Sequence, residues 1–248
     1  MNLIFQPEVA QKKPHGSNNC PFCEPSDLTD ILDQEGDCIW VVNKYRTLKD
    51  AWQTLIIETN QHDGDFSNYT QTQNRAIIKF AYSKWQEVIA SEKFRSVLFY
   101  KNFGPHSGGS LTHPHMQIVG LDQIDVLDNV AIDNFTGIKV WEQGGVKVNL
   151  STQPIGGFLE INFWLDSVKA LDSFADSLQI VVRYLMNDYL EGRMDSYNLF
   201  FYQFPGQVLV KILARYVTSP YFVGYKIPQV NDEKTMEHIK NQLGQLLC

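Results

Sequence analysis

The segment from His113 to Gly120 constrains the fold of this chain more than any other. It places His113, His115, Gln117 and a valine at alternate positions, with proline, methionine, isoleucine and glycine between them. Because successive side chains of a strand point to opposite faces, the segment is predicted to be a strand with an apolar back and a largely polar front. Two imidazoles and an amide are costly to bury without hydrogen-bond partners, so the polar front indicates a role beyond packing.

A glycine-containing loop precedes this strand. Gly104, Gly108 and Gly109 allow the loop to bring backbone N–H groups together on an anionic oxygen. The chain carries 21 Lys and Arg against 28 Asp and Glu, a formal net charge of -7, with no dense basic run. We therefore expect no nucleic-acid partner, whereas a small phosphorylated ligand is compatible with the loop.

Hydrophobic periodicity predicts the same order of elements twice, namely two strands, a helix and two strands. In the first half these are residues 38–42, 54–58, 71–91, 96–100 and 113–120. In the second half they are residues 145–150, 158–165, 166–191, 196–202 and 208–213, followed by a short strand near 221–227 and a helix from 232. We expect an α+β chain of two fused units, residues 1–125 and 126–248, each an antiparallel sheet with a packed helix.

The cysteines and the N-terminal residues bear on cellular location. Residues 1–13 show no basic region followed by an apolar stretch, and no apolar run approaches the roughly 20 residues that span a bilayer. We expect a cytoplasmic protein without a membrane partner, where a disulfide framework is not expected. Cys20 and Cys23 form a close pair, while Cys38 and Cys248 stand alone, and Cys38 is expected to be buried.

The pair formed by Cys20 and Cys23 has three readings: a zinc knuckle, a redox pair or coincidence. Two thiolates combined with imidazoles from a distant segment are the usual tetrahedral zinc set. A redox pair is disfavoured, because a polar leader replaces the strand that precedes a thioredoxin-like pair. The pattern favours zinc.

Several segments, taken together, resemble galactose-1-phosphate uridylyltransferase, a family of the histidine-triad superfamily. They are Cys20-Pro21-Phe22-Cys23, Asn43-Lys44-Tyr45, Ile56-Ile57-Glu58 with His62, and the run from Asn102 through Gly104, Gly108 and Ser110 to His113-Pro114-His115 and Gln117. The match covers roughly residues 20 to 120 and is specific as a combination. The second half is similar to the family in element order and a few scattered residues. The resemblance implies two fused histidine-triad-like units.

The resemblance also implies a chemistry. Cys20, Cys23, His62 and His113 would bind zinc, and His115 would be the nucleophile. This histidine would attack the α-phosphorus of a nucleoside-diphosphate sugar, and a phosphorylated acceptor would then take the nucleotidyl group. A neutral imidazole suits this role near pH 7.

The resemblance assigns substrate contacts as well. Gln117 and Ser110 would bind phosphate oxygens, Asn102 and Gly108 would shape the phosphate loop, and Asn43, Lys44 and Tyr45 would line the nucleoside pocket. The chain departs from the family in three places. Residues 1–19 lack its arginine-rich segment, Met116 stands where the family has a small residue, and the mostly apolar run Val208–Arg215 replaces its second histidine-bearing strand.

Other functions stay open at this point. The same nucleophile could serve phosphorolysis or hydrolysis of a dinucleoside polyphosphate. The chain could instead be a nucleotide-binding zinc protein without turnover, or His113 and His115 could both ligate a catalytic zinc that activates water. Trp141 and Trp164 are expected in the core or at a dimer contact, which leaves a homodimer open.

Overall fold

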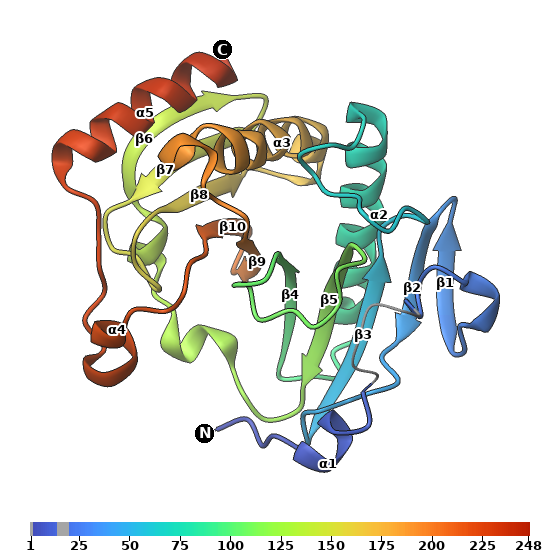
Figure 1. The fold of residues 1–248 in the computed structure, drawn as a ribbon. Helices are drawn as coiled ribbons and strands as arrows, with labels where there is room; N and C mark the ends of the chain where they lie inside the picture. The colour runs from blue at the N-terminus through green and yellow to red at the C-terminus, as the bar shows by residue number, and fades with distance from the viewer. Residues whose placement is uncertain (1, 14–19) are drawn as a thin grey trace. The chain divides into compact units, whose positions relative to one another are not determined.

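The computed structural model describes residues 2–13 and 20–248, so the predicted leader residues 14–19 lie outside the described part. The chain divides into two compact units, each built from several stretches. The first contains Met1–Asp65, Ala76–Lys101 and Ser110–Asp128, and the second contains Phe66–Arg75, Asn102–Gly109 and Asn129–Cys248. Figure 1 shows the order of the elements along the chain. The predicted boundary at residues 125 and 126 stays a prediction.

The first unit is built on an antiparallel sheet with strand order β1-β2-β3-β5-β4. Its strands are β1 (Ile31–Glu35), β2 (Cys38–Val42), β3 (Ala51–Ile57), β4 (Ser96–Phe103) and β5 (His115–Leu121). The helices in this part of the chain are α1 (Pro7–Ala10), η1 (Pro25–Asp27), α2 (Gln71–Ala90) and η2 (Val126–Asn129). The register sets His115 opposite Ile57 and Gln117 opposite Leu55. We call the face that carries these four side chains the front of the first sheet.

Helix α2 packs on the back of this sheet. Trp85 is fully buried, its ring lies 5.5 Å from that of Phe99, and its Nε1–H donates to the carbonyl of Val97 at 3.1 Å. Met116 and Ile118 of β5 are also fully buried. The predicted apolar back of the strand is therefore confirmed, and β5 is fixed from behind by the core.

The second unit is built on an antiparallel sheet with strand order β9-β10-β8-β7-β6. Its strands are β6 (Gly137–Gln143), β7 (Val146–Ser151), β8 (Glu160–Leu165), β9 (Tyr197–Phe204) and β10 (Gln207–Ala214). Its helices are η3 (Ile132–Phe135), η4 (Val168–Ala170), α3 (Leu171–Asn187), η5 (Tyr189–Gly192), α4 (Pro220–Tyr225) and α5 (Glu233–Leu247). Phe174 of α3 packs against Phe163 of β8 with ring centroids 5.3 Å apart. The predicted α+β class with two fused units is confirmed.

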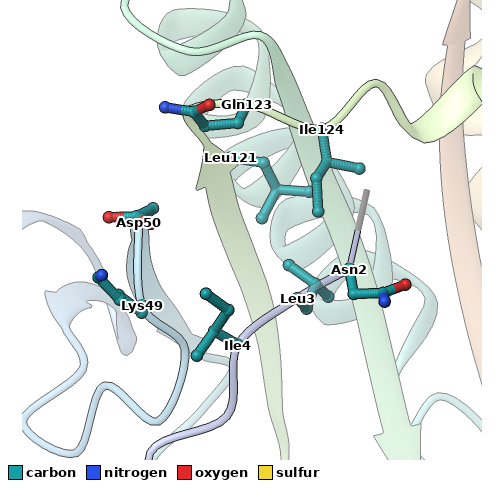
Figure 2. Close-up of a pocket in the computed structure, with 8 residues that line it drawn as sticks. All are labelled: Asn2, Leu3, Ile4, Lys49, Asp50, Leu121, Gln123 and Ile124. Carbon is teal, nitrogen blue, oxygen red and sulfur yellow. The ribbon is translucent and has the colours of Figure 1, made fainter.

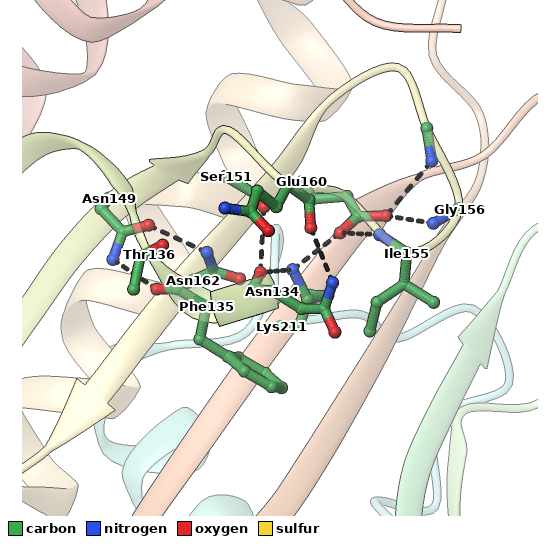
Figure 3. Close-up of polar contacts among 12 residues, drawn as sticks. Asn134, Phe135, Thr136, Asn149, Ser151, Ile155, Gly156, Glu160, Asn162 and Lys211 are labelled. Atoms are coloured by element: carbon green, nitrogen blue, oxygen red, sulfur yellow. Dashed lines mark hydrogen bonds and ion pairs between the residues drawn. The ribbon is translucent and has the colours of Figure 1, made fainter. Parts of the chain in front are cut away.

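The other face of the second sheet, its front, holds a buried polar network (Figure 3). Lys211 Nζ lies 2.7 Å from Glu160 Oε2, and both side chains are fully buried. The same ammonium donates to the carbonyl of Asn134 at 2.8 Å and lies 5.0 Å from the ring centroid of Phe135. Helix η3 therefore covers this part of the front of the second sheet.

Two predictions about the second half were wrong. The segment near residues 221–227 is not a strand but helix α4, because Pro220 starts it, the Ser219 hydroxyl accepts from the N–H of Tyr221 at 3.2 Å, and Lys226 ends it in the left-handed conformation. The helix predicted over 166–191 is shorter. It begins at Leu171 and ends at Asn187, and the left-handed backbone at Leu190 and Glu191 prevents its continuation.

Candidate metal centre and reactive strand

The structure brings the four predicted metal ligands together within the first unit. The ligand atoms of Cys20, Cys23, His62 and His113 all lie within 4.8 Å of one another. The cysteines frame a tight turn, in which the N–H of Cys23 donates to the carbonyl of Cys20 at 3.2 Å. His62 follows β3, and His113 stands two residues before β5. The cluster could hold a metal ion.

The donor set fits zinc in both chemistry and orientation. The Nδ1 atoms of His62 and His113 lie 3.3 and 3.6 Å from Cys23 Sγ. On its other side, His113 donates its Nε2–H to the carbonyl of Thr59 at 2.8 Å, which fixes the tautomer and leaves Nδ1 as the ligand atom. Burial lowers the pKa of His113, so the imidazole is neutral, as a metal ligand must be. Two thiolates with two imidazoles are a common structural zinc set.

His115, the first residue of β5, is buried and lies outside this four-residue cluster. Its Nδ1–H donates to the carbonyl of His113 at 2.8 Å, so the lone pair is on Nε2. Burial lowers the pKa of His115 to about 4, and the positive charge of Lys101 acts in the same direction. The side chain is therefore a neutral imidazole of defined tautomer, the form required of a nitrogen nucleophile.

Phe22, between the two cysteines, joins the knuckle formed by Cys20–Cys23 to the histidines at the start of β5. Its ring centroid lies 5.7 Å from that of His113 and 5.6 Å from that of His115, in edge-on geometry. It belongs to a buried cluster on the front of the first sheet, formed by Phe22, Ile39, Val41, Leu55 and Ile57. A displacement of the knuckle would therefore displace both imidazoles.

Gln117 lies beside His115 on the front of β5, opposite Tyr100 of β4. The Tyr100 hydroxyl donates to Gln117 Oε1 at 3.0 Å. Burial raises the pKa of Tyr100 to about 12, so the hydroxyl stays protonated and remains a donor. Because Oε1 accepts this bond, Gln117 can offer its Nε2–H groups to an anionic oxygen.

A buried ion pair under the strand is not indicated by the sequence patterns. Lys101 Nζ lies 2.5 and 2.6 Å from the two carboxylate oxygens of Glu58, and 3.7 Å from Asp65 Oδ1. The backbone N–H of Glu58 donates to the carbonyl of Pro114 at 3.1 Å. The ion pair thus joins the end of β3 to β4, and the backbone bond joins it to Pro114 between the two histidines. A lysine on a strand gives no sign of such a partner until the fold is known.

The predicted nucleoside-pocket residues follow β2. The Asn43 side chain accepts from the N–H of Tyr45 at 2.9 Å, and the N–H of Asn43 donates to the carbonyl of Gln53 at 2.9 Å. Asn43 and Tyr45 are half-buried, and Lys44 is exposed. The structure therefore fixes this turn, while its role in binding stays a prediction.

The predicted phosphate-loop residues are divided between the units. Asn102 and Gly108 belong to the second unit, and Ser110, which is exposed, belongs to the first. Gly108 is also exposed and has a φ of +85°, a left-handed conformation that favours glycine. Asn102 is half-buried, and its Oδ1 accepts from Asn198 Nδ2 at 2.7 Å. Asn198 is absent from the sequence-based prediction, since a lone strand asparagine carries no motif.

Comparison with known proteins identifies the family. A family model described as the N-terminal domain of DUF4931, a domain of unknown function, matches residues 5–124, and the C-terminal domain model of the same family matches residues 127–247. The chain belongs to the DUF4931 family. A crystal structure of a DUF4931 protein from Bacillus cereus is 43% identical, with a TM-score of 0.80, and the alignment covers 88% of this chain and 99% of that one.

Two more distant structures share the fold of this DUF4931 protein. A uridylyltransferase is 17% identical with a TM-score of 0.72, over 95% of this chain and 94% of that chain. An ADP-glucose phosphorylase from Arabidopsis thaliana with bound ADP-glucose is 13% identical with a TM-score of 0.70, over 99% and 98% of the two chains. The expected resemblance to uridylyltransferases is confirmed at the level of the fold.

A further relative matches only a part of the DUF4931 chain. A di-/tripeptide transporter of Lactobacillus helveticus is 30% identical over 96 residues, which are 36% of this chain and 18% of the transporter. The match thus spans less than a fifth of that protein. Among the described residues of the DUF4931 chain, no helix is long and apolar enough to cross a membrane.

A small cavity lies at the opposite end of β5 from His115. It has a volume of about 160 Å³, and it is lined by Asn2, Leu3, Ile4, Lys49, Asp50, Leu121, Gln123 and Ile124. Figure 2 shows these lining residues, of which Asn2, Leu3 and Ile4 belong to the N-terminal segment. Neither the four candidate ligands nor His115 is among the lining residues described, so we place no chemistry there.

Proposed function

We propose that this DUF4931 protein is a nucleotidyltransferase that uses His115 as a covalent nucleophile and a nucleoside-diphosphate sugar as donor. The observation that carries the proposal is the state of His115, a buried neutral imidazole whose Nδ1–H is bound to the His113 carbonyl. A fold shared with a uridylyltransferase and an ADP-glucose phosphorylase supports the proposal. Fold alone does not fix function, so the residues must carry the argument.

The proposed reaction has two displacements. His115 Nε2 attacks the α-phosphorus, a P–N bond forms, and the bond from this phosphorus to the bridging oxygen breaks, so that sugar 1-phosphate leaves with the electron pair. A phosphate oxygen of the acceptor then attacks the same phosphorus and breaks the P–N bond, which restores the neutral imidazole. Gln117 donates to the phosphoryl oxygens as charge shifts during both steps.

The remaining roles are proposed from the same pattern. Ser110 binds a phosphate oxygen, Asn102 and Gly108 shape the phosphate loop, and residues 43–45 line the nucleoside pocket. Zinc held by Cys20, Cys23, His62 and His113 would stabilise the knuckle and keep His113 from acting as a nucleophile. A zinc ion of this kind contributes to folding rather than to the reaction itself.

Intact-protein mass spectrometry tests the nucleophile. Wild type, His115→Ala and the control His238→Ala, whose side chain is exposed, are incubated separately with UDP-glucose, UDP-galactose and ADP-glucose. We expect a mass increase of one nucleotidyl group in wild type and in the control, and none in His115→Ala. An adduct that persists in His115→Ala would assign the nucleophile to another residue.

Phosphorolysis is the second candidate, favoured by the fold shared with an ADP-glucose phosphorylase. Here orthophosphate, rather than a sugar phosphate, discharges the nucleotidyl-histidine, and a dinucleoside polyphosphate could replace the nucleotide sugar. Adding orthophosphate or a sugar 1-phosphate to the isolated adduct and identifying the product separates the two candidates. The homodimer stays a prediction, which light scattering tests by a molar mass of either 28.5 kDa or twice that value.

A further inference from the structure

A chain of three polar side chains within the second unit ends at Asn102. Arg215, just after β10, donates from Nη1 to Asn198 Oδ1 at 2.7 Å. Asn198 of β9 donates from Nδ2 to Asn102 Oδ1 at 2.7 Å, and from the same nitrogen to the carbonyl of Ser107 at 3.0 Å. These two acceptors stand near the two ends of the segment 102–109.

The chain of bonds has only one orientation. A guanidinium is an obligate donor at any accessible pH, so the atom of Asn198 that faces Arg215 must be its oxygen. Nδ2 then points toward the loop, and both of its hydrogens are used. Asn198 is 1% exposed, so water cannot readily replace these bonds. A flipped amide would set a nitrogen against the guanidinium and an oxygen against two acceptors.

The orientation of Asn198 fixes that of Asn102. Because Asn102 Oδ1 accepts from Asn198, the Asn102 Nδ2 atom is directed away from it, and within the described part of the chain no residue accepts a hydrogen bond from this nitrogen. The loop is also held to the two residues that precede β9. The N–H of His106 donates to Ser196 Oγ at 3.0 Å, and Gly104, with a φ of +81°, approaches Asp195 so closely that a Cβ would lie 2.0 Å from its carbonyl oxygen.

We propose that Asn198 and Arg215 are positioning residues that keep the amide N–H2 of Asn102 directed at a phosphoryl oxygen of the nucleotide. The inference rests on the proposed function, because it assumes that the loop binds phosphate. It assigns a role to Arg215 that the sequence does not indicate. Arg215 acts through Asn198 and does not contact the ligand.

The test compares ligands with and without phosphate. Isothermal titration calorimetry measures UMP against uridine, and AMP against adenosine, for wild type and Asn198→Asp. Aspartate has the same shape and can accept from Arg215, but it has no hydrogen for Asn102, whose amide must then turn its oxygen to the phosphate. We expect about a 10- to 100-fold loss of affinity for the monophosphate, as for a lost hydrogen bond to a charged group, and less than about a 3-fold change for the nucleoside.

A double variant separates positioning from the added negative charge. In an Asn102→Ala background the substitution Asn198→Asp should no longer change the ratio of monophosphate to nucleoside affinity, because the side-chain amide through which Asn198 acts on the ligand has been removed. Arg215→Gln should weaken monophosphate binding, whereas Arg193→Gln, which removes an equal charge from an exposed pair with Glu191, should not.

The outcomes are distinct. If wild type binds neither UMP nor AMP, the proposed function fails and this inference with it. If wild type binds a monophosphate and Asn198→Asp binds it equally well, the inference is overturned and the proposed function stands. The same conclusion follows if Asn198→Asp lowers the monophosphate affinity as much in the Asn102→Ala background as in the wild-type background. Unchanged nucleoside affinity in each variant shows that the fold is intact.

Discussion

Single hydrogen bonds decide what the candidate site can offer a ligand. An amide side chain carries a donor and an acceptor end, and an anionic oxygen is attracted only to the donor. Tyr100 donates to the oxygen of Gln117, just as Asn198 does to that of Asn102. In both cases the neighbour that touches the oxygen leaves the nitrogen for the ligand. Preorganisation of this kind lowers the cost of reorienting dipoles as charge moves during the reaction.

The variant Tyr100→Phe tests whether the Tyr100 hydroxyl orients the Gln117 amide. The variant keeps the ring and removes the donor, so Gln117 is free to turn its oxygen toward the phosphate. A lost neutral hydrogen bond is worth about 0.5 to 1.5 kcal/mol, which predicts a rate of adduct formation about 2- to 13-fold lower. Single-turnover mass spectrometry measures the rate, and Tyr221→Phe, at an exposed position, serves as control. An unchanged rate in Tyr100→Phe would show that Gln117 needs no such orientation.

Alanine substitution at Gly104 tests the conformation of the phosphate loop, and the same substitution at Gly206, outside the loop, is the control. Both have positive φ, but a Cβ at Gly104 would meet the Asp195 carbonyl at 2.0 Å, while a Cβ at Gly206 would meet nothing within 4 Å. Gly206→Ala should cost about 1 to 2 kcal/mol of unfolding free energy from the backbone alone, and Gly104→Ala should cost more. Urea unfolding of both variants measures the difference. Equal losses would mean that the loop relaxes around the added methyl group.

The secondary structure elements that the sequence predicts are those that bury a continuous set of apolar residues. Strand β2 is nearly buried throughout, and helix α3 has a continuous apolar stripe. Strands β1 and β6 escape prediction because neither has a buried face: all five residues of β1 are exposed, and no residue of β6 is buried. The residues of α4 favour a strand individually, but its capping residues and the lack of a partner strand make it helical.

The buried pair of β8 and β10 carries an element-scale prediction. Lys211→Met leaves the Glu160 carboxylate fully buried, with only the N–H groups of Ile155 and its neighbours to stabilise it. Removing one partner of a buried ion pair typically costs about 3 to 5 kcal/mol, and we expect this loss in chemical denaturation. The double variant Lys211→Met with Glu160→Leu should recover much of the loss. Recovery would fail if η3 depends on the hydrogen bond that the Lys211 ammonium donates to the Asn134 carbonyl.

At the scale of the whole molecule, the two units have the same strand arrangement, but the fronts of their sheets carry different side chains. In the first, β5 carries His115 and Gln117, while in the second, β10 carries Lys211 beneath η3. The alternation of His113, His115 and Gln117 predicts the polar front of the first sheet, while Cys20, Cys23 and His62 are assigned to it by the resemblance. The sequence could not predict Lys101 or Arg215, because their partners, Glu58 and Asn198, are brought near only by strand pairing. The partner of such an isolated charged residue is determined by the fold and not by sequence spacing.

The difference between the two units leads to a prediction of the metal content. Within the described residues, one group of donors satisfies the spacing of a metal site, so we expect one zinc per chain by mass spectrometry of metals. His115→Ala should keep it, since His115 is not among the four donors, whereas Cys20→Ser should lose most of it. Loss of zinc from His115→Ala would instead favour a catalytic metal held by both His113 and His115, with water as the attacking group.

Chelation should destabilise the first unit in particular. Because the unfolded chain does not hold the four donors together, free zinc at 100 times its Kd stabilises the folded state by about 2.7 kcal/mol. Removing it should lower the melting temperature of wild type but not that of Cys20→Ser. Phe22 packs on both imidazoles, so the same treatment should also slow adduct formation at His115. A chelated protein with unchanged melting temperature and full reactivity would mean that packing alone holds the reactive strand.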